Sequence, residues 1–320
     1  MIAFLDGGTT QTRLRVWDGQ HVRFDAARPV GARQGAVEGH TRALRTAVRE
    51  LIEVARLQFV LDSVVACGML TSPSGLAEIQ HLQAPVSAQQ LASGMVHLDI
   101  EGCGEILFIP GVRTGNSDVM RGEETEVTGL RQRLTLTGPV NFLHFGSHDK
   151  LIVTNDEGIQ GSQTNINGEL LSVLTGQTIL WASTVPPESL GKVDLDCWQQ
   201  GLEAARQHGL SQAAFLVRVN GLLGGLTPEQ GTSWLLGVLA EANLRWIEAA
   251  EASTTTVLYG RATATEPLAA YLSARGFQVQ LASETDSALA AVSGAAQLHD
   301  LWLRTSGNPS ATQTGVSVIS

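Results

Sequence analysis

Short apolar runs that end in glycine alternate with longer segments of helical periodicity along this chain. The first run, Ile2 to Leu5, leads into Asp6-Gly7-Gly8, which predicts a buried strand that enters a tight turn. From Arg13 to Trp17 polar and apolar residues alternate, as in a returning strand. Further runs predict strands at 63–66, 106–109, 256–259 and 277–281. Helical spacing predicts helices over 37–57, 123–133, 168–180, 197–208, 228–252, 266–275 and 284–303.

The opening of the chain recurs near its middle. Ile2 to Asp18 reads IAFLDGGTTQTRLRVWD and Val140 to Asp156 reads VNFLHFGSHDKLIVTND, each a strand, a glycine-hydroxyl turn and a second strand. A repeat that occurs twice at long spacing indicates two related domains rather than a solenoid, although two unrelated hairpins would share the same pattern. We therefore predict domains at 1–133 and 134–305 and a flexible tail at 306–320, with the helix at 284–303 free to pack back on the first domain.

Composition and charge narrow the classes of protein. Apolar residues make up 43% of the 320, which is enough to bury a core, and the formal net charge is -10. An acidic chain lacks the positive field that nucleic-acid binding needs. The three cysteines are widely spaced and suit neither a disulfide framework nor a zinc site. The sequence contains no long apolar span and no leader peptide pattern, so we expect a cytoplasmic protein without a membrane partner.

The first glycine turn has the chemistry of a phosphate-binding loop. Gly7 and Gly8 would let backbone N–H groups approach an anion, and the hydroxyls of Thr9 and Thr10 would donate further hydrogen bonds. Asp6, at the end of the strand, could hold Mg²⁺ through water, because this cation takes oxygen ligands and keeps much of its hydration. A plain hairpin turn explains the same residues, since Asp-Gly is a common hairpin signal.

Two later motifs could complete a nucleotide site. In the repeat, Gly146, Ser147 and Lys150 supply a matching glycine, hydroxyl and cation, with His148 between them. Two such loops facing across a cleft would hold both ends of a triphosphate. At Gly260-Arg261 a predicted strand ends before a helix, where a base or ribose could lie on the backbone; this is not a Walker loop. The plainer interpretations are a surface or core histidine, a strand-edge lysine and an ordinary β-α turn.

Acidic residues open the helix predicted at 123–133. Met120 to Glu126 reads MRGEETE, and such a run is usually a solvated helix start, where the helix dipole favours carboxylates. Beside two phosphate loops, however, Glu123 or Glu124 could take a proton from an attacking hydroxyl. Arg121 could pair with a substrate carboxylate in the bidentate way that lysine cannot.

These motifs resemble the actin/hexokinase/Hsp70 superfamily, in which two α/β domains each open with such a hairpin and ATP binds between them. MRGEET, with IPG upstream at 109–111, resembles the 2-dehydro-3-deoxygalactonokinase family more specifically, as do GSHDK at 146–150 and NGEL at 167–170. The motifs keep the family's order over nearly the whole chain. The resemblance implies two ribonuclease-H-like domains that flank a nucleotide cleft.

The resemblance also implies an activity, ATP- and Mg²⁺-dependent phosphorylation of the terminal hydroxyl of 2-dehydro-3-deoxy-D-galactonate. A kinase for another sugar or sugar acid, and a non-catalytic nucleotide-binding protein of the same fold, remain open, as does the oligomeric state, with a homodimer among the options. In the superfamily the catalytic carboxylate often opens a helix before the second hairpin, which favours Glu123, then Glu124, then Asp118. Asp6 is assigned to Mg²⁺ through water and to catalysis. The other expected contacts are Gly7, Gly8, Thr9, Thr10, Gly146, Ser147 and His148 for phosphate, Gly260 and Arg261 for nucleotide, and Arg13, Arg121 and Lys150 for substrate.

Three motifs depart from the family's usual pattern. At 6–10 this chain has DGGTT where the family usually has DWGST. At 145–151 it has FGSHDKL where the family usually has PGTH followed by a small residue and Lys-Trp. At 167–170 it has NGEL in place of TGEL. Residue types that bind phosphate survive all three changes. Asp149 adds a negative charge that we expect near the phosphates, where the family's usual loop has a small residue.

Overall fold

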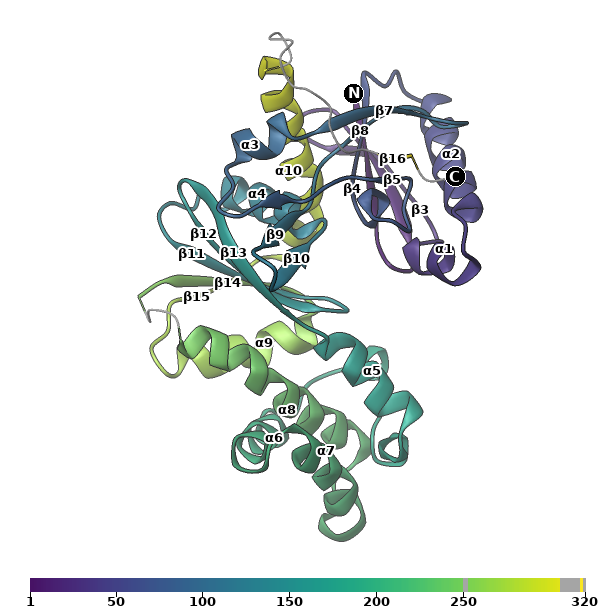
Figure 1. Cartoon of the computed structure of the whole chain (residues 1–320). Coiled ribbons are helices and arrows are strands. Elements are labelled where there is room, and N and C mark those ends of the chain that lie inside the picture. Colours follow the sequence, from purple (N-terminus) through teal and green to yellow (C-terminus); the bar gives the residue numbers. More distant parts are fainter. Residues whose placement is uncertain (250–252, 306–316, 319–320) are drawn as a thin grey trace. The chain divides into compact units, whose positions relative to one another are not determined.

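The chain forms two compact units. The computed structural model describes residues 1–249, 253–305 and 317–318 (Figure 1). Unit 1 comprises Met1–Gly138, Thr154–Ser162 and Glu284–Ser320, and unit 2 comprises Pro139–Val153 and Gln163–Ser283. The sequence predicted a boundary near residue 134 and left the helix at 284–303 free to pack on the first domain. In the structure the boundary follows Gly138, the segment Thr154–Ser162 returns to unit 1 in addition, and the chain from Glu284 onward also belongs to unit 1. None of the helices in the described ranges combines the length and the apolar character that a membrane span requires.

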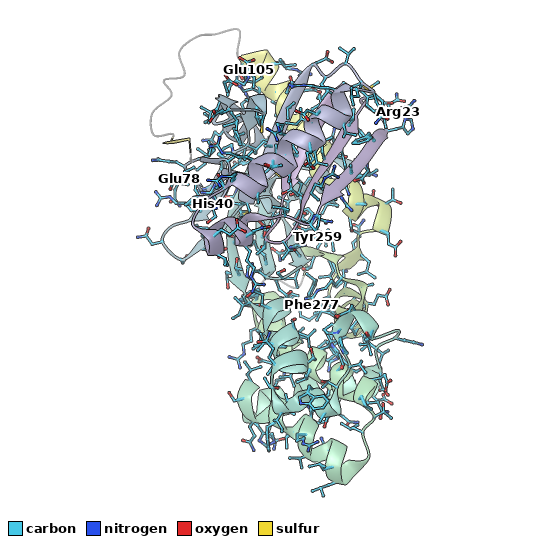
Figure 2. The ribbon with its side chains drawn as sticks, turned by 90° about the vertical axis from the view of Figure 1, so that its right-hand side faces the viewer. Arg23, His40, Glu78, Glu105, Tyr259 and Phe277 are labelled. Carbon is cyan, nitrogen blue, oxygen red and sulfur yellow. The ribbon has the colours of Figure 1, made fainter. Side chains whose placement is uncertain are left out.

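A six-stranded mixed sheet forms the centre of unit 1, in the order β3-β2-β1-β4-β8-β7. Its first three strands are an antiparallel meander, β4 and β8 run parallel to β1, and β7 is antiparallel to β8. The strands are β1 (Ile2–Gly7), β2 (Thr12–Trp17), β3 (Val22–Arg28), β4 (Ser63–Gly68), β7 (Val96–Ile100) and β8 (Gly104–Phe108). The predicted strands at 2–5, 13–17, 63–66 and 106–109 all fall on strands of this sheet, and Figure 2 labels Arg23 on its edge strand β3.

The helix predicted over 37–57 begins only at Arg42, and a separate helix that was not predicted ends just before it. They are α1 (Ala32–Glu38) and α2 (Arg42–Arg56), and the break falls at Gly39, whose φ of 73° is the left-handed conformation that glycine adopts at helix ends. In α2 the side chains of Leu44, Val48 and Leu51 are buried and pack with the apolar face of the sheet. The helical periodicity was therefore interpreted correctly from 42 onward, and the glycine ended the preceding helix.

Helices α4 (Glu123–Arg133) and α10 (Glu284–Thr305) lie side by side in unit 1 (Figure 1). Glycines make the close crossing possible, because a Cβ on Gly129 would overlap the carbonyl oxygen of Ala290 and one on Gly294 would overlap that of Thr125. The bounds predicted for α4 are confirmed, and α10 continues two residues beyond its predicted end.

The smaller elements of unit 1 connect these layers. A three-stranded sheet has the order β10-β9-β6, and β16 pairs antiparallel with β5. The predicted flexible tail falls mostly outside the described residues, but Ser317 and Val318 form strand β16 rather than loose chain. The bounds are β5 (Ala77–Glu78), β6 (Leu82–Gln83), β9 (Val112–Thr114), β10 (Asp118–Met120), β16 (Ser317–Val318), α3 (Ala88–Ser93) and the 3₁₀ turn η1 (Met69–Thr71).

Unit 2 repeats the strand order of unit 1. The second sheet runs β13-β12-β11-β14-β15, with the end of β12 and most of β13 counted in unit 1. In it β14 is parallel to both β11 and β15, just as β4 is parallel to both β1 and β8. The strands are β11 (Val140–Phe145), β12 (Asp149–Asn155), β13 (Gly158–Asn165), β14 (Thr255–Gly260) and β15 (Val279–Leu281). The shared topology supports the duplication inferred from the sequence repeat, since two unrelated hairpins would not be followed by the same parallel neighbours.

Helices form the rest of unit 2. Their core includes Trp198, Leu202 and Leu239, and the partly buried Phe277, labelled in Figure 2, packs against it. The helix predicted at 168–180 is α5, which ends at 177, and the helix predicted at 266–275 is α9, which begins at 262. The sequence did not predict α7. The helix predicted at 228–252 is α8, and residues 250–252 lie outside the described ranges. The bounds are α5 (Asn167–Gln177), α6 (Leu195–His208), α7 (Leu210–Val219), α8 (Pro228–Glu248), α9 (Ala262–Ser273), η2 (Ile179–Ser183), η3 (Pro187–Ser189) and the π turn η4 (Asn220–Gly224).

Candidate active site

The first glycine turn is held by the N-terminus of α1. The Gly8 N–H donates to the Gln11 carbonyl at 2.8 Å, which closes the turn between β1 and β2. The carbonyls of Gly8 and Thr9 accept the N–H groups of Ala32 and Arg33 at 3.1 and 2.9 Å. Because a helix start has N–H groups without internal partners, α1 satisfies these loop carbonyls and fixes the backbone of the turn.

Asp6 lies beside a glycine that keeps space near its carboxylate. In the parallel register of β1 and β4, Asp6 is opposite Cys67 and Gly7 is opposite Gly68. Gly68 has a φ of 68°, and a Cβ there would lie 3.2 Å from Asp6 Oδ1. Among the described residues no group of three or more potential ligands could hold a metal by itself. A single carboxylate nevertheless suits Mg²⁺, which commonly takes its other oxygen ligands from phosphates and water.

The start of α4 lies next to the end of β4. Gly122 has a φ of 112°, and a Cβ on it would lie 3.5 Å from the Cα of Gly68. Burial raises the pKa of the Cys67 thiol well above its ordinary value, and the nearby charges of Asp6 and Glu124 raise it further. The structure therefore brings Asp6 and the acidic start of α4 into one region of unit 1, around this buried thiol.

The two adjacent glutamates have different environments. Glu124 is fully buried; both of its carboxylate oxygens accept the Gly122 N–H, at 2.9 and 2.8 Å, and Oε1 also accepts the Thr125 hydroxyl at 3.1 Å. Burial, followed by the charge of Glu123, raises the pKa of Glu124 to about 7. Glu123 is half-buried, and its Oε2 accepts the Arg121 N–H at 3.1 Å. Glu123 is thus the more accessible carboxylate, and Glu124 is enclosed by its own helix start.

The Arg121 guanidinium is engaged within unit 1. Its Nη1 donates to the carbonyl and hydroxyl of Thr71 at 2.6 and 2.7 Å. Its Nη2 donates to the Ile79 carbonyl at 3.0 Å and lies 3.4 Å from His81 Nδ1. These contacts tie the segment before α4 to the chain near β5. They leave no bidentate face of the guanidinium open in this structure, so the bidentate substrate contact expected of Arg121 would require it to break these bonds.

Two other candidates in unit 1 also have polar neighbours. Nε of Arg13 lies 3.3 Å from a carboxylate oxygen of Asp25 on β3, and both side chains are substantially exposed. Asp118, on β10, accepts a hydrogen bond from the Ser162 hydroxyl. Ser162 in turn binds Thr114 through its N–H at 2.8 Å. Asp118 therefore has a structural role within this network, which does not test its place as the third candidate base.

The second glycine turn is held in unit 2 by the N-terminus of α5. The Ser147 carbonyl accepts the Glu169 N–H at 2.9 Å, and His148 Nε2 lies 3.2 Å from Glu169 Oε1. A Cβ on Gly168 would overlap the carbonyl oxygen of Gly146, so this position needs glycine for the close approach. The same arrangement, a glycine turn against a helix start, occurs in both units. Lys150 is buried at 4% exposure.

The third motif lies at the same sheet edge as the second turn. In the parallel register Gly260 is opposite Phe145, and the Arg261 N–H donates to the Phe145 carbonyl at 3.1 Å. Gly260 has a φ of 105°, and a Cβ there would overlap that carbonyl. The Asp149 carboxylate is buried between Asn167, Asn243 and Arg261, and the expectation that it adds charge near the phosphates stays a prediction.

Sequence reasoning missed the residues that support these motifs. Gly68 ends a strand that was predicted, and a glycine at that point is the signal that could have marked it. Nothing in the sequence pattern marks Asn243, which lies near the C-terminal end of the long helix α8 and reaches Asp149 only through the fold.

Two copies of one α/β layout, each with a glycine turn after its central strand, define a protein of the actin/hexokinase-like fold. The 2-keto-3-deoxy-galactonokinase family model matches residues 6–295, and the chain therefore belongs to that family. The family resemblance and the fold class predicted from the sequence are confirmed.

Individual relatives are more distant. The chain is 29% identical over 189 residues to the 2-dehydro-3-deoxygalactonokinase of Escherichia coli K12. The aligned region covers 57% of this chain and 60% of that protein. The chain is 26% identical over 185 residues to a Rhizobium meliloti protein proposed to have the same activity, covering 56% of this chain and 57% of the relative. These matches thus span less than two thirds of either relative.

Solved structures extend the similarity in fold over the whole chain. A Sinorhizobium meliloti protein proposed to be a 2-dehydro-3-deoxygalactonokinase has a TM-score of 0.76 at 20% identity, covering 98% of this chain and 99% of that one. The activator of the 2-hydroxyisocaproyl-CoA dehydratase from Clostridium difficile, solved with bound ADPNP, has a TM-score of 0.50 at 12% identity, with 98% and 99% coverage. At these identities the likeness concerns the fold alone.

Proposed function

We propose that this protein transfers the γ-phosphoryl group of ATP to the terminal hydroxyl of 2-dehydro-3-deoxy-D-galactonate, giving 2-dehydro-3-deoxy-6-phosphogalactonate and ADP in the cytoplasm. The family match over residues 6–295 supports a kinase of this kind. The observation that carries the proposal is the meeting of Asp6 with the acidic start of α4 in unit 1. Phosphoryl transfer needs positioned oxygen ligands and a proton acceptor more than it needs covalent chemistry.

In this proposal the carboxylates of unit 1 have different roles. Asp6 would hold Mg²⁺ through water, and the cation would neutralise charge on the β- and γ-phosphates. Glu123 would accept the proton of the attacking hydroxyl as the oxygen–phosphorus bond forms and the bond to the ADP oxygen breaks. The half-buried position of Glu123 supports this assignment over the enclosed Glu124. Glu124 would keep the start of α4 in place through Gly122.

The glycine turns would supply the phosphate contacts. Backbone N–H groups and hydroxyls at 7–10 in unit 1, and those at 146–148 in unit 2, would bind phosphate oxygens of ATP, and Gly260 and Arg261 would border the nucleoside. The helix starts that hold both turns support this role, because a fixed loop keeps its donors oriented towards an anion. Arg13, which is substantially exposed, would neutralise the substrate carboxylate or phosphate. Lys150 is buried and would reach that charge only if the turn before it moved, whereas Arg121 would mainly anchor the segment before α4.

Substrate-dependent ADP release tests the proposal. A coupled assay with ATP and Mg²⁺ should show ADP release with 2-dehydro-3-deoxygalactonate that greatly exceeds release without it, and Glu123→Gln should remove this difference. A panel of hexonates and deoxy-ketoacids separates the substrates. Faster turnover of another sugar acid would mean that the proposed substrate is wrong and that the proposed reaction, phosphorylation by ATP, is right. ATP binding without consumption stimulated by any compound of the panel would instead indicate a nucleotide-dependent binding protein.

A further inference from the structure

A carboxylate in unit 2 lies where four elements meet. Asp149 is the first residue of β12, directly after the second glycine turn, and its side chain is 4% exposed. Its Oδ2 accepts hydrogen bonds from Asn243 Nδ2 on α8 at 2.8 Å and from Asn167 Nδ2 on α5 at 3.2 Å. Its Oδ1 lies 3.7 Å from Nη2 of Arg261, in the turn between β14 and α9. One side chain therefore links the glycine turn to the turn predicted to border the nucleotide.

The surroundings shield the Asp149 carboxylate from solvent. Asp149, Asn167, Asn243 and Arg261 line a cavity of about 20 Å³ together with apolar side chains that include Trp198. Such a volume is about that of one water molecule, so bulk water does not surround the Asp149 carboxylate. Burial raises the pKa of Asp149, and hydrogen bonding by Asn243, the charge of Arg261 and hydrogen bonding by Asn167 oppose the change. A carboxylate in this position is stabilised as an anion by a cation beside it.

The guanidinium has fewer fixed contacts than the carboxylate. Arg261 donates its backbone N–H to Phe145 at 3.1 Å, while its side chain is 34% exposed. Among the described residues, Arg261 Nε and Asp149 Oδ1 are buried without a hydrogen-bond partner. The two asparagines fix the carboxylate, and the carboxylate is the charged group that fixes the direction of the guanidinium.

We propose that Asp149 is a positioning residue for nucleotide binding, which holds the Arg261 guanidinium at the turn that borders the nucleoside. The proposal rests on the proposed function, since it takes the ligand at this edge of the sheet to be ATP or ADP. The proposal also explains why an acidic residue is tolerated in the motif at 145–151, because the charges of Asp149 and Arg261 cancel and add no net charge near the phosphates.

A double-mutant cycle on nucleotide affinity tests the coupling. The dissociation constant of MgADP is measured by calorimetry for the wild-type chain, Asp149→Asn, Arg261→Gln and the double variant. Each single variant should weaken binding about tenfold, the loss expected when one charge-assisted hydrogen bond is no longer oriented. The double variant should be no weaker than the weaker single variant, because both changes remove the same interaction. Glu248→Gln is the matched control, since it breaks a carboxylate–guanidinium pair between α8 and α6 and should leave affinity unchanged.

The outcomes separate the two proposals. If the effects of the single variants multiply in the double variant, or if Asp149→Asn binds MgADP like the wild-type chain, Asp149 does not position Arg261. If the wild-type chain binds no MgADP, the proposed function fails and this inference fails with it. Should Asp149→Asn not fold, Asn243→Ala takes its place; it removes the 2.8 Å contact and should weaken MgADP binding in the wild-type background but not in Arg261→Gln.

Discussion

The buried carboxyl group of Glu124 makes the stability of unit 1 depend on pH. Its pKa is raised from 4.5 to about 7, mainly because burial disfavours the charged form. Between these two values the unfolded chain has released the proton while the folded chain still holds it. The free energy of unfolding therefore falls as pH rises through this window, and the loss is complete above pH 7.

The size of the effect follows from the same two values. Their difference, at about 1.36 kcal/mol per pKa unit, corresponds to about 3 kcal/mol of stability that is present below pH 4.5 and absent above pH 7. Glu124→Gln removes the ionisation and keeps an amide oxygen that can accept the Gly122 N–H. The unfolding free energy of the variant minus that of the wild-type chain should thus increase by about 3 kcal/mol from pH 4.5 to pH 8.

Urea denaturation at a series of pH values measures this difference. Hydrogen exchange of the α4 amides reports on unit 1 separately, which matters because the two units need not unfold together. Glu53→Gln, on α2 of the same unit with a side chain that is 64% exposed, is the control and should give a nearly constant difference. Parallel wild-type and Glu124→Gln curves over the whole window would refute the reasoning, because they would mean that burial does not perturb this group.

Three further substitutions test the site and the packing. Asp6→Asn should lower kcat by two or more orders of magnitude, about 3 kcal/mol of barrier, with an unchanged circular dichroism spectrum; full activity would remove Asp6 from the mechanism. Glu123→Gln should abolish turnover and spare MgADP binding measured by calorimetry, whereas loss of turnover in Glu124→Gln alone would move the base by one residue. Gly129→Ala should destabilise the crossing of α4 and α10 by about 1–3 kcal/mol or more, measured as a fall in Tm, while Gly176→Ala, a helical position with open space around it, should be neutral or slightly stabilising.

Much of the fold could be predicted from the sequence, because its signals are local. Strands that end in glycine, such as β1 and β4, and the helix start at Glu123 were placed correctly from neighbouring residues alone. The repeat of the first hairpin was visible because both copies need the same residue types in the same order. The helix predicted at 37–57 shows the limit of such patterns, since apolar spacing alone did not show that Gly39 ends one helix before the next begins.

The candidate site was predicted less completely, because burial and pairing depend on residues that are distant along the chain. Glu123 and Glu124 are adjacent and chemically identical, and the packing around the start of α4 encloses one and leaves the other accessible. The burial of Asp149 was not predicted, because one of the side chains that hold it inside unit 2, Asn243, is 94 residues away along the chain.

The sequence by itself determined the residue types, the order of the glycine turns and the duplicated layout of two α/β units. The tertiary structure decided which polar groups lose their water and which partners replace it. A charge is inexpensive in solvent and costly in a protein interior unless a partner compensates for it. The pKa of Glu124 and the link from Asp149 to Arg261 therefore became visible only when the helices and strands that surround them were in place.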